Sequence, residues 1–336
     1  MELLLLWAVV ALAGGFAFLN GFHDVSNSVS TAVRTRALTP TVAVILVAFF
    51  NLLGALMGTS LALFFTEVGV DLPRGTQGLG ILAAGLLAAG LWGLVTWYRG
   101  MPSSSTHALL GGLIGAISAA QLLGGSTRSE TGGVFLMQIG LPLLLSPLAA
   151  YAVAYLAVFP ATWILRYQAP RKVNAGNRMA QAVLTGTFAL GHGLQDGQRT
   201  MAVVVLALVG AGMASGSSIP VWVQVFAAVL LAAGSLFGGW RIAYTLAHRL
   251  VRIDPLRGMT AQSVSATMLF VGAIWLDMPL SSTHTMTSAI VGAGSNQRFS
   301  SVRATVLLKV LGTWLATAII TALAGGTFFL ALSPLL

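Results

Sequence analysis

Long apolar stretches alternate with short polar segments along the whole 336-residue chain. About ten of the stretches are long enough to cross a bilayer, for which roughly 20 apolar residues are needed. The pattern therefore predicts an all-α polytopic membrane protein, with five crossings before and five after a basic segment at 166–178. The predicted spans are 3–33, 40–65, 78–98, 103–123, 134–165, 179–209, 220–246, 260–275, 279–294 and 304–332.

Two polar motifs interrupt this pattern, and each occurs once in each group of spans. Residues 20–24 read Asn-Gly-Phe-His-Asp, and residues 192–196 read His-Gly-Leu-Gln-Asp. The segments 102–107 and 279–284 both begin with Pro and end in Ser-Ser-Thr-His. Order and spacing are nearly the same in both halves, which predicts an internal duplication with one site built from both copies.

The duplication divides the chain into a first repeat at 1–168, a cytoplasmic linker at 169–178 and a second repeat at 179–336. The first span of each repeat is half as long again as an ordinary crossing and carries the Gly/His/Asp motif near its middle. We therefore expect a broken helix there in both repeats. Counting each broken span twice gives 10–12 helical segments.

The basic residues predict the orientation of these spans. With the nine loops numbered along the chain, odd loops hold twelve Lys or Arg residues, whereas even loops hold only Arg74 and Arg128. Basic loops stay in the cytoplasm, so both termini are expected outside a plasma (inner) membrane. Five crossings per half then give the halves opposite orientations, which makes the duplication an inverted repeat.

Composition narrows the function classes further. Only 7% of the residues are charged, against roughly 25% in soluble proteins, so the lipid bilayer is a partner. The formal charge of +9 is explained by the cytoplasmic loops, and no nucleic-acid partner is predicted. The chain has no cysteine, which excludes a thiolate metal site and a cysteine nucleophile.

Asp24 and Asp196 are predicted to lie within the membrane. A charge at the bilayer centre costs at least ~2.5–3.5 kcal/mol, so each carboxylate needs compensation. We expect a coupling cation, Na⁺ or H⁺, at these residues. The alternative is a pair of structural contacts, Asp196 with Arg199 and Asp24 with an imidazole such as His23.

The Pro-x-Ser-Ser-Thr-His segments are predicted helix starts, since Pro suits the first turn and Ser or Thr suits the cap. Unpaired N–H groups and a positive dipole end lie at such a start. With added hydroxyls, the segments predict a nest for an oxyanion such as phosphate or sulfate; close helix packing is the alternative. The hydroxyls are those of Ser104, Ser105, Thr106, Ser281, Ser282 and Thr283.

His107 and His284 follow these hydroxyls directly. They are expected to orient a hydroxyl, donate to the anion or relay a proton, with a purely structural role as the alternative. No metal site is predicted, because the spacing of metal-ligand residues along the chain is not a normal one. The serines lack the elbow of a hydrolase, so no enzyme is expected; an intramembrane hydrolase and an anion channel remain weaker alternatives.

Residues 21–27 (Gly-Phe-His-Asp-Val-Ser-Asn) and 192–199 (His-Gly-Leu-Gln-Asp-Gly-Gln-Arg), with the paired Ser-Ser-Thr-His segments, resemble the bacterial type of the inorganic phosphate transporter (PiT) family. The resemblance covers both halves. It implies a phosphate symporter with an inverted repeat of roughly twelve helical segments, a homodimer and no cofactor. Sulfate or arsenate are further substrates that it leaves open.

The resemblance also assigns residues. It implies that Asp24, Asn27, Asp196 and Gln198 lie in the cation and substrate region and that Ser104, Ser105, Thr106, Ser282 and Thr283 contact phosphate. We add Ser281 and Arg199 to the substrate set, and His23 and Gln195 to the cation set. The sodium-coupled pattern is Gly-x-Asn-Asp, but this chain has His23 and Gln195 in place of the two asparagines. Proton coupling is therefore predicted, with Na⁺-coupled phosphate or sulfate symport as the alternative.

Overall fold

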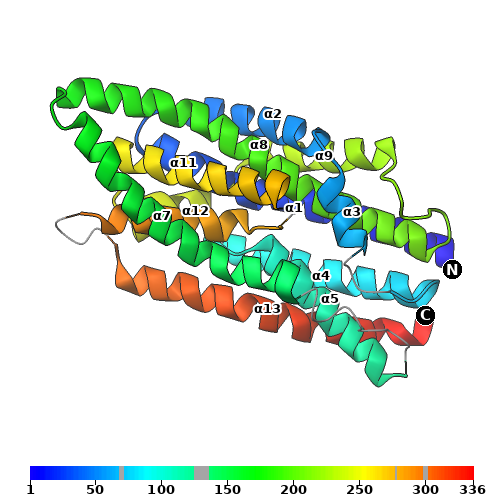
Figure 1. Cartoon of the computed structure of the whole chain (residues 1–336). Helices are drawn as coiled ribbons and strands as arrows, with labels where there is room; N and C mark the ends of the chain where they lie inside the picture. The colour runs from blue at the N-terminus through cyan, green and yellow to red at the C-terminus, as the bar shows by residue number, and fades with distance from the viewer. Residues whose placement is uncertain (68–71, 125–135, 277, 298–301) are drawn as a thin grey trace.

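Helices make up the protein, as the apolar pattern predicted. The computed structural model describes residues 1–336 except 68–71, 125–135, 277 and 298–301. Within the described residues, the β-structure is one isolated bridge between Val251 and Val302. The helices lie roughly along one common direction (Figure 1). They are α1 (Glu2–Arg34), α2 (Pro40–Leu56), α3 (Ser60–Glu67), α4 (Thr76–Tyr98), α5 (Ser105–Leu122), η1 (Leu136–Gly140), α7 (Leu141–Leu165), α8 (Pro170–Gly210), α9 (Val221–Phe237), α10 (Trp240–Tyr244), η2 (Thr245–Leu250), α11 (Pro255–Phe270), η3 (Val271–Trp275), α12 (Ser282–Ser295), α13 (Ala304–Leu332) and η4 (Ser333–Leu335).

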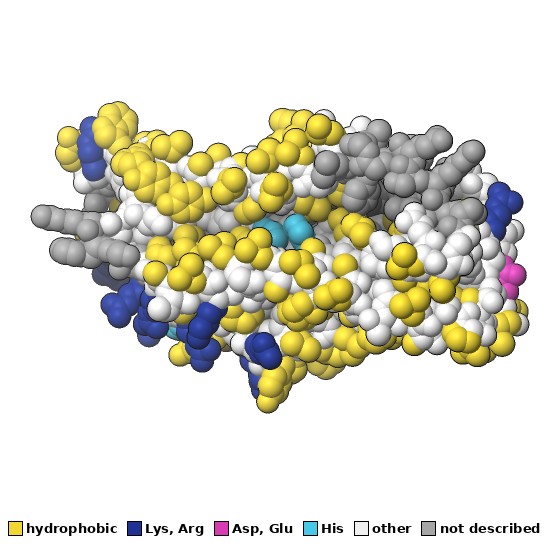
Figure 2. Space-filling view, turned by 90° about the horizontal axis from the view of Figure 1, so that it is seen from below, with side chains coloured by type: hydrophobic (Ala, Val, Ile, Leu, Met, Phe, Trp, Pro, Cys, Tyr) yellow, Lys and Arg dark blue, Asp and Glu magenta, His cyan; other side chains and the backbone are white. Residues whose placement is uncertain are grey.

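Several of these helices are long and apolar enough to cross a membrane. In the described part of the chain they are Glu2–Arg34, Thr76–Tyr98, Met137–Leu165 and Ala304–Leu335, and the pair α9 and α10–η2, bent by 57°, brings the number to five. Apolar side chains cover much of the face in Figure 2, and Lys and Arg side chains gather mostly towards one end. The chain is a helical membrane protein with several apolar spans, and the full count of ten crossings stays a prediction.

The expected breaks in the two motif-bearing helices are wrong. α1 and α8 continue without interruption over 33 and 41 residues. Their glycines serve close packing instead, because a side chain on Gly21 would collide with the Leu231 carbonyl and one on Gly193 with the Asn51 backbone. The breaks lie in the next segment of each half, between α2 and α3 and between α9 and α10. At the second of these, Gly238 has a φ of +66°, which suits glycine.

α5 and α12 are shorter than the hydrocarbon core of a bilayer, where the sequence predicted complete crossings. Their 18 and 14 residues give about 27 and 21 Å, less than the ~30 Å of the hydrocarbon core. The Ser281 hydroxyl donates to the Ser104 hydroxyl at 2.9 Å, so the two N-terminal ends meet within the molecule. From there α5 and α12 run towards opposite ends (Figure 1).

The two halves of the chain exchange their last long helices. α7 packs against α12 of the second half, and α13 packs against α5 of the first. The other contacts between halves are also paired, since α1 packs on α9 as α2 packs on α8. Both termini lie at one end of the molecule, and the turn from α7 to α8 lies at the other (Figure 1).

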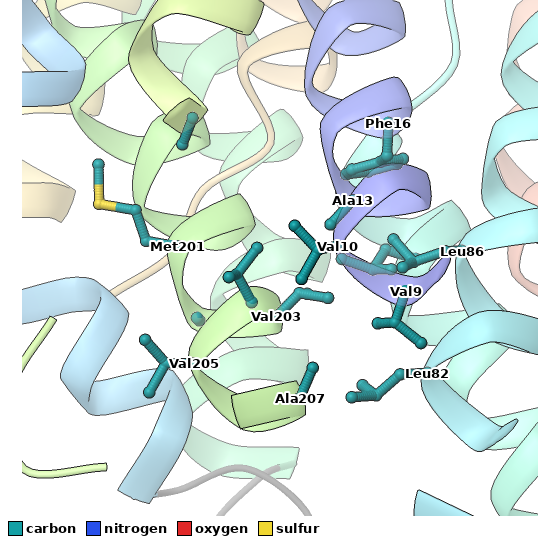
Figure 3. Packing of buried hydrophobic residues seen from close by; sticks show 14 of the residues in the cluster. Val9, Val10, Ala13, Phe16, Leu82, Leu86, Met201, Val203, Val205 and Ala207 are labelled. Carbon is teal, nitrogen blue, oxygen red and sulfur yellow. The ribbon is translucent and has the colours of Figure 1, made fainter. Parts of the chain in front are cut away.

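Buried residues of α1 change character along its length. Towards the end that holds the termini they are apolar, and they join an apolar cluster with α4 and α8 (Figure 3). From Asn20 to Thr31 most buried residues of α1 are polar. The functional groups therefore lie beside a well-packed apolar region rather than within it. The labelled members of this α1–α4–α8 cluster are Val9, Val10, Ala13, Phe16, Leu82, Leu86, Met201, Val203, Val205 and Ala207.

Candidate functional site

α1 and α8 pack against each other and bring the two predicted aspartates together. Asp24 and Asp196 are each 1% exposed. The His192 imidazole lies between them, with Nε2 3.0 Å from Asp196 Oδ2 and 3.7 Å from Asp24 Oδ2. These three residues each offer one ligand atom within 4.8 Å of the others. They form a buried group that could hold a cation, which local spacing in the sequence did not reveal.

Both structural contacts that the sequence allowed as the alternative are present. Arg199 forms an ion pair with Asp196, three residues earlier on the same helix. His23 Nδ1 lies 2.8 Å from Asp24 Oδ1. The protein thus supplies a positive or titratable partner for each buried carboxylate.

Arg199 also connects Asp196 to the start of α5. Its guanidinium donates to the Ser105 hydroxyl at 3.3 Å and to the Thr106 hydroxyl as well. Arg199 is 4% exposed, and such a buried guanidinium interacts strongly because little water screens it. One side chain therefore joins the predicted cation residues to the predicted anion residues.

Asp24 makes the corresponding connection to α12. The Thr283 hydroxyl donates to Asp24 Oδ1 at 3.0 Å, and the Ser282 hydroxyl donates to Oδ2 at 3.4 Å. Asn27 in turn donates its Nδ2 to the Thr283 hydroxyl at 3.0 Å. Each aspartate is thus linked to the Ser-Thr segment of the other half, Asp24 directly and Asp196 through Arg199.

The two Ser-Ser-Thr-His segments cap their helices as predicted. Ser104 accepts from the backbone N–H of His107 at 3.3 Å, and Ser281 accepts from that of His284 at 3.2 Å. Because α5 and α12 meet at these ends, two positive dipole ends point at one region. Backbone N–H groups and hydroxyls from both halves converge there, which is an arrangement suited to an oxyanion.

The two motif histidines face each other across this junction. The His107 and His284 rings have centroids 4.6 Å apart, and His284 stacks on Trp314 at 4.0 Å. His107 Nδ1 lies 2.9 Å from the Ser104 hydroxyl, so His107 is in a position to orient that hydroxyl. The His284 Nε2 atom is buried and has no hydrogen-bond partner within the described residues.

Within the described residues, the Gln195 and Gln198 side chains form no hydrogen bond with the aspartates. The Gln195 amide donates to the Leu269 carbonyl at 2.9 Å and accepts from the Leu280 N–H at 2.9 Å. Gln198 accepts from the Ala62 N–H at 3.1 Å. Both amides thus tie α8 to neighbouring segments, and their predicted roles as cation or substrate ligands stay predictions.

Three polar residues of the site were not predicted as site residues. Asn20 donates its Nδ2 to Asp196 Oδ2 at 2.8 Å, and Asn51 Oδ1 lies 3.0 Å from His192 Nδ1. Asn20 and His192 belong to the duplicated motifs, so the repetition could have identified them. Asn51 is a lone amide in an apolar helix, and a buried amide needs a partner.

A cavity of about 20 Å³ lies beside the site, bounded by Asn20, His23, Ser104 and Ser105 among others. Such a volume holds about one water molecule and is too small for a tetrahedral oxyanion.

Comparison with known proteins identifies relatives along nearly the whole chain. A family model described as "Phosphate transporter family" matches residues 20–325. The chain is 36% identical to a probable low-affinity inorganic phosphate transporter of Rhizobium meliloti, over 93% of this chain and 92% of the relative. It is 34% identical to a protein of the same description in Bacillus subtilis, over 99% of both. A solved structure, "The sodium-dependent phosphate transporter", shares the fold with a TM-score of 0.73 and 20% identity, covering 99% of this chain and 100% of that one.

Proposed function

Because the chain belongs to the phosphate transporter family and is an inorganic phosphate transporter rather than an enzyme, we propose that it is a secondary symporter driven by a cation gradient. The observation that carries this proposal is the contact of Arg199 with Asp196 on one side and with Ser105 and Thr106 on the other. The alternative of an intramembrane hydrolase is dropped, because the chain belongs to a transporter family.

Phosphate binds between the starts of α5 and α12. Ser104, Ser105 and Thr106 come from one half and Ser281, Ser282 and Thr283 from the other. The meeting of the two helix ends through the 2.9 Å bond between Ser104 and Ser281 supports this site. Hydroxyls and N–H groups bind an anion without a rigid cluster of cations, which also allows phosphate to leave.

The coupling cation binds at Asp24 and Asp196. We propose a proton, because an imidazole nitrogen can accept a proton and pass it on and both His23 and His192 contact these carboxylates. The second candidate is Na⁺, favoured by the description of the structural relative as sodium-dependent and by the carboxylate oxygens. The buried Asn20 Oδ1, which has no hydrogen-bond partner within the described residues, also favours it. His23 offers nitrogen where the sodium pattern has an amide oxygen.

Arg199 couples the two sites. A bound phosphate attracts the guanidinium and competes with Asp196 for it, since Arg binds phosphate and carboxylate oxygens alike. Asp196 then has no positive charge beside its carboxylate within the membrane, and binding of a cation supplies that charge again. Phosphate binding and cation binding thereby become mutually dependent.

The paired contacts between the halves support an inverted repeat, with boundaries at 1–168 and 179–336. α1 packs against α9, and α5 packs against α13. Replacing each helix by its counterpart in the other half gives two further contacts that are also present, α8 with α2 and α12 with α7. The repeat carries alternating access around the junction of α5 and α12. We also propose that the protein is a homodimer with both termini outside and the 169–178 linker in the cytoplasm of a plasma (inner) membrane.

Uptake of labelled phosphate into proteoliposomes tests the proposal. A proton gradient alone should drive accumulation, a protonophore should abolish it, and removal of Na⁺ should leave it. Accumulation that needs a sodium gradient and ignores the proton gradient would identify Na⁺ as the coupling ion. Equilibration without accumulation would reject symport altogether. Unlabelled sulfate and arsenate, added as competitors, define the substrate range.

A further inference from the structure

A second phosphate-compatible site lies away from the aspartates, on the surface. A hollow of about 460 Å³ is present where the end of α4 meets α10 and η2. Its lining combines three arginines with three large aromatic residues. They are Tyr98, Arg99, Trp240, Arg241, Tyr244 and Arg249, together with Gly100.

Two of the three guanidiniums lie over aromatic rings, and within the described residues none of the three has an acidic partner. Arg241 lies over the rings of Trp97 and Tyr98, 5.0 Å from each, and donates to the Tyr98 carbonyl at 3.0 Å. Arg249 lies over the Tyr244 ring at 5.2 Å. Within the described residues none of the three forms an ion pair with Asp or Glu. The stacking holds the Arg241 and Arg249 guanidiniums in place and leaves their remaining N–H donors available.

The surroundings are those of a membrane surface. Arg241 belongs to the bent apolar pair formed by α9 and α10–η2, where an unpaired charge is costly. Tyr98, Trp240 and Tyr244 are exposed, and exposed Trp and Tyr concentrate where the hydrocarbon meets water. Arg99 and Arg249 also belong to two of the loops that the basic residues assign to the cytoplasm.

We propose that this hollow binds the phosphate headgroup of an anionic phospholipid from the cytoplasmic leaflet. Basic pockets between membrane helices on that side suit such headgroups, and a guanidinium can bind two phosphate oxygens at once. The neighbouring exposed aromatic residues face the lipid chains. Free inorganic phosphate has the same charged oxygens as the headgroup, but it has no lipid chains to contact these aromatic residues.

Native mass spectrometry on protein released from nanodiscs tests the proposal. The nanodiscs contain equal amounts of phosphatidylcholine and phosphatidylglycerol, and the measurement counts the lipids that stay bound. The test variant carries Arg99→Gln, Arg241→Gln and Arg249→Gln. The matched control removes three exposed linker charges through Arg171→Gln, Lys172→Gln and Arg178→Gln. A double variant, Arg99→Gln with Arg249→Gln, keeps the Arg241 bond to Tyr98 if the triple variant does not fold.

Wild type and control should retain phosphatidylglycerol in preference to phosphatidylcholine. The triple variant should bind phosphatidylglycerol about a hundredfold more weakly, and the double variant less so, from the usual contribution of each basic residue near a membrane surface. Equal retention by variant and control would overturn the proposal. So would displacement of the lipid by millimolar inorganic phosphate in the wild type but not in the triple variant, because the hollow would then be a site for the free anion.

Discussion

At the residue scale, one side chain, Arg199, contacts both Asp196 and the hydroxyls at the start of α5. Lysine carries the same charge but lacks the planar fork that reaches two groups at once. In this structure the fork contacts Asp196 through one nitrogen and the α5 hydroxyls through the other. Under the proposed mechanism, the identity of this residue bears on coupling as well as on affinity.

Arg199→Lys should weaken uptake and loosen coupling together. One lost hydrogen bond to a charged group is worth roughly 1.5–3 kcal/mol, so phosphate affinity should fall about tenfold or more. The number of cations moved per phosphate, measured from the reversal potential of uptake, should also fall. Arg178→Lys in the exposed linker is the control and should change neither quantity. A variant with lower affinity but an unchanged ratio would show that Arg199 only binds phosphate.

His23→Asn separates proton coupling from phosphate binding. His23 contacts Asp24 through Nδ1, and its Nε2 lies 3.4 Å from the Thr96 hydroxyl. The variant should lose more of the pH dependence of uptake than of the affinity for phosphate, because the imidazole beside Asp24 is gone and the α5 and α12 hydroxyls remain. Uptake at several pH values with and without Na⁺ measures both. Should the pH dependence persist unchanged, His192 would be the better candidate for the proton.

At the scale of elements, the starts of α5 and α12 were predictable and the interruptions were not. Pro, Ser and Thr specify a helix start by local chemistry, and the expected caps at Ser104 and Ser281 are present. A break depends on what packs beside the helix. Gly21 and Gly193 look like weak points in the sequence, yet close contacts with α9 and α2 keep those helices continuous. Hydropathy also could not reveal that α5 and α12 meet in the interior.

The starts of α5 and α12 also give a prediction about the affinity for phosphate. Ser105→Ala with Thr106→Ala removes the hydroxyls at the start of α5, and Ser282→Ala with Thr283→Ala those of α12. Phosphate affinity should fall on the order of tenfold or more per lost contact, measured by titration of purified protein. Ser118→Ala, an exposed hydroxyl on α5 that bonds only the Ile114 carbonyl, is the control. Unchanged affinity in both double variants would mean that these residues serve helix packing.

At the scale of the whole molecule, the predicted orientation in the membrane comes from the basic loops. The termini lie together at the end opposite the linker, which agrees with an even number of crossings. The aspartate pair was predictable because the motif repeats, whereas its link through His192 was not, since it depends on how α1 crosses α8.

Single introduced cysteines should map the orientation, because the chain has none of its own. A cysteine at Asn174 in the exposed start of α8 should react with a membrane-impermeant reagent only after the cytoplasmic face is opened. One at Ser333 should react from outside in intact cells. A linker that reacts only from outside would reject the inverted-repeat topology, and Val203→Cys in the buried apolar cluster should stay unreactive from both sides.

The exchange of α7 and α13 between halves has a consequence for biosynthesis. α7 is made before its partner α12, so the newly inserted first half holds an incomplete helix bundle until the ribosome has finished most of the second. A chain that stops at the linker leaves α5 without α13 and α7 without α12. Quality-control proteases should therefore remove such a fragment, whereas the two halves made as separate polypeptides in one cell should rescue each other.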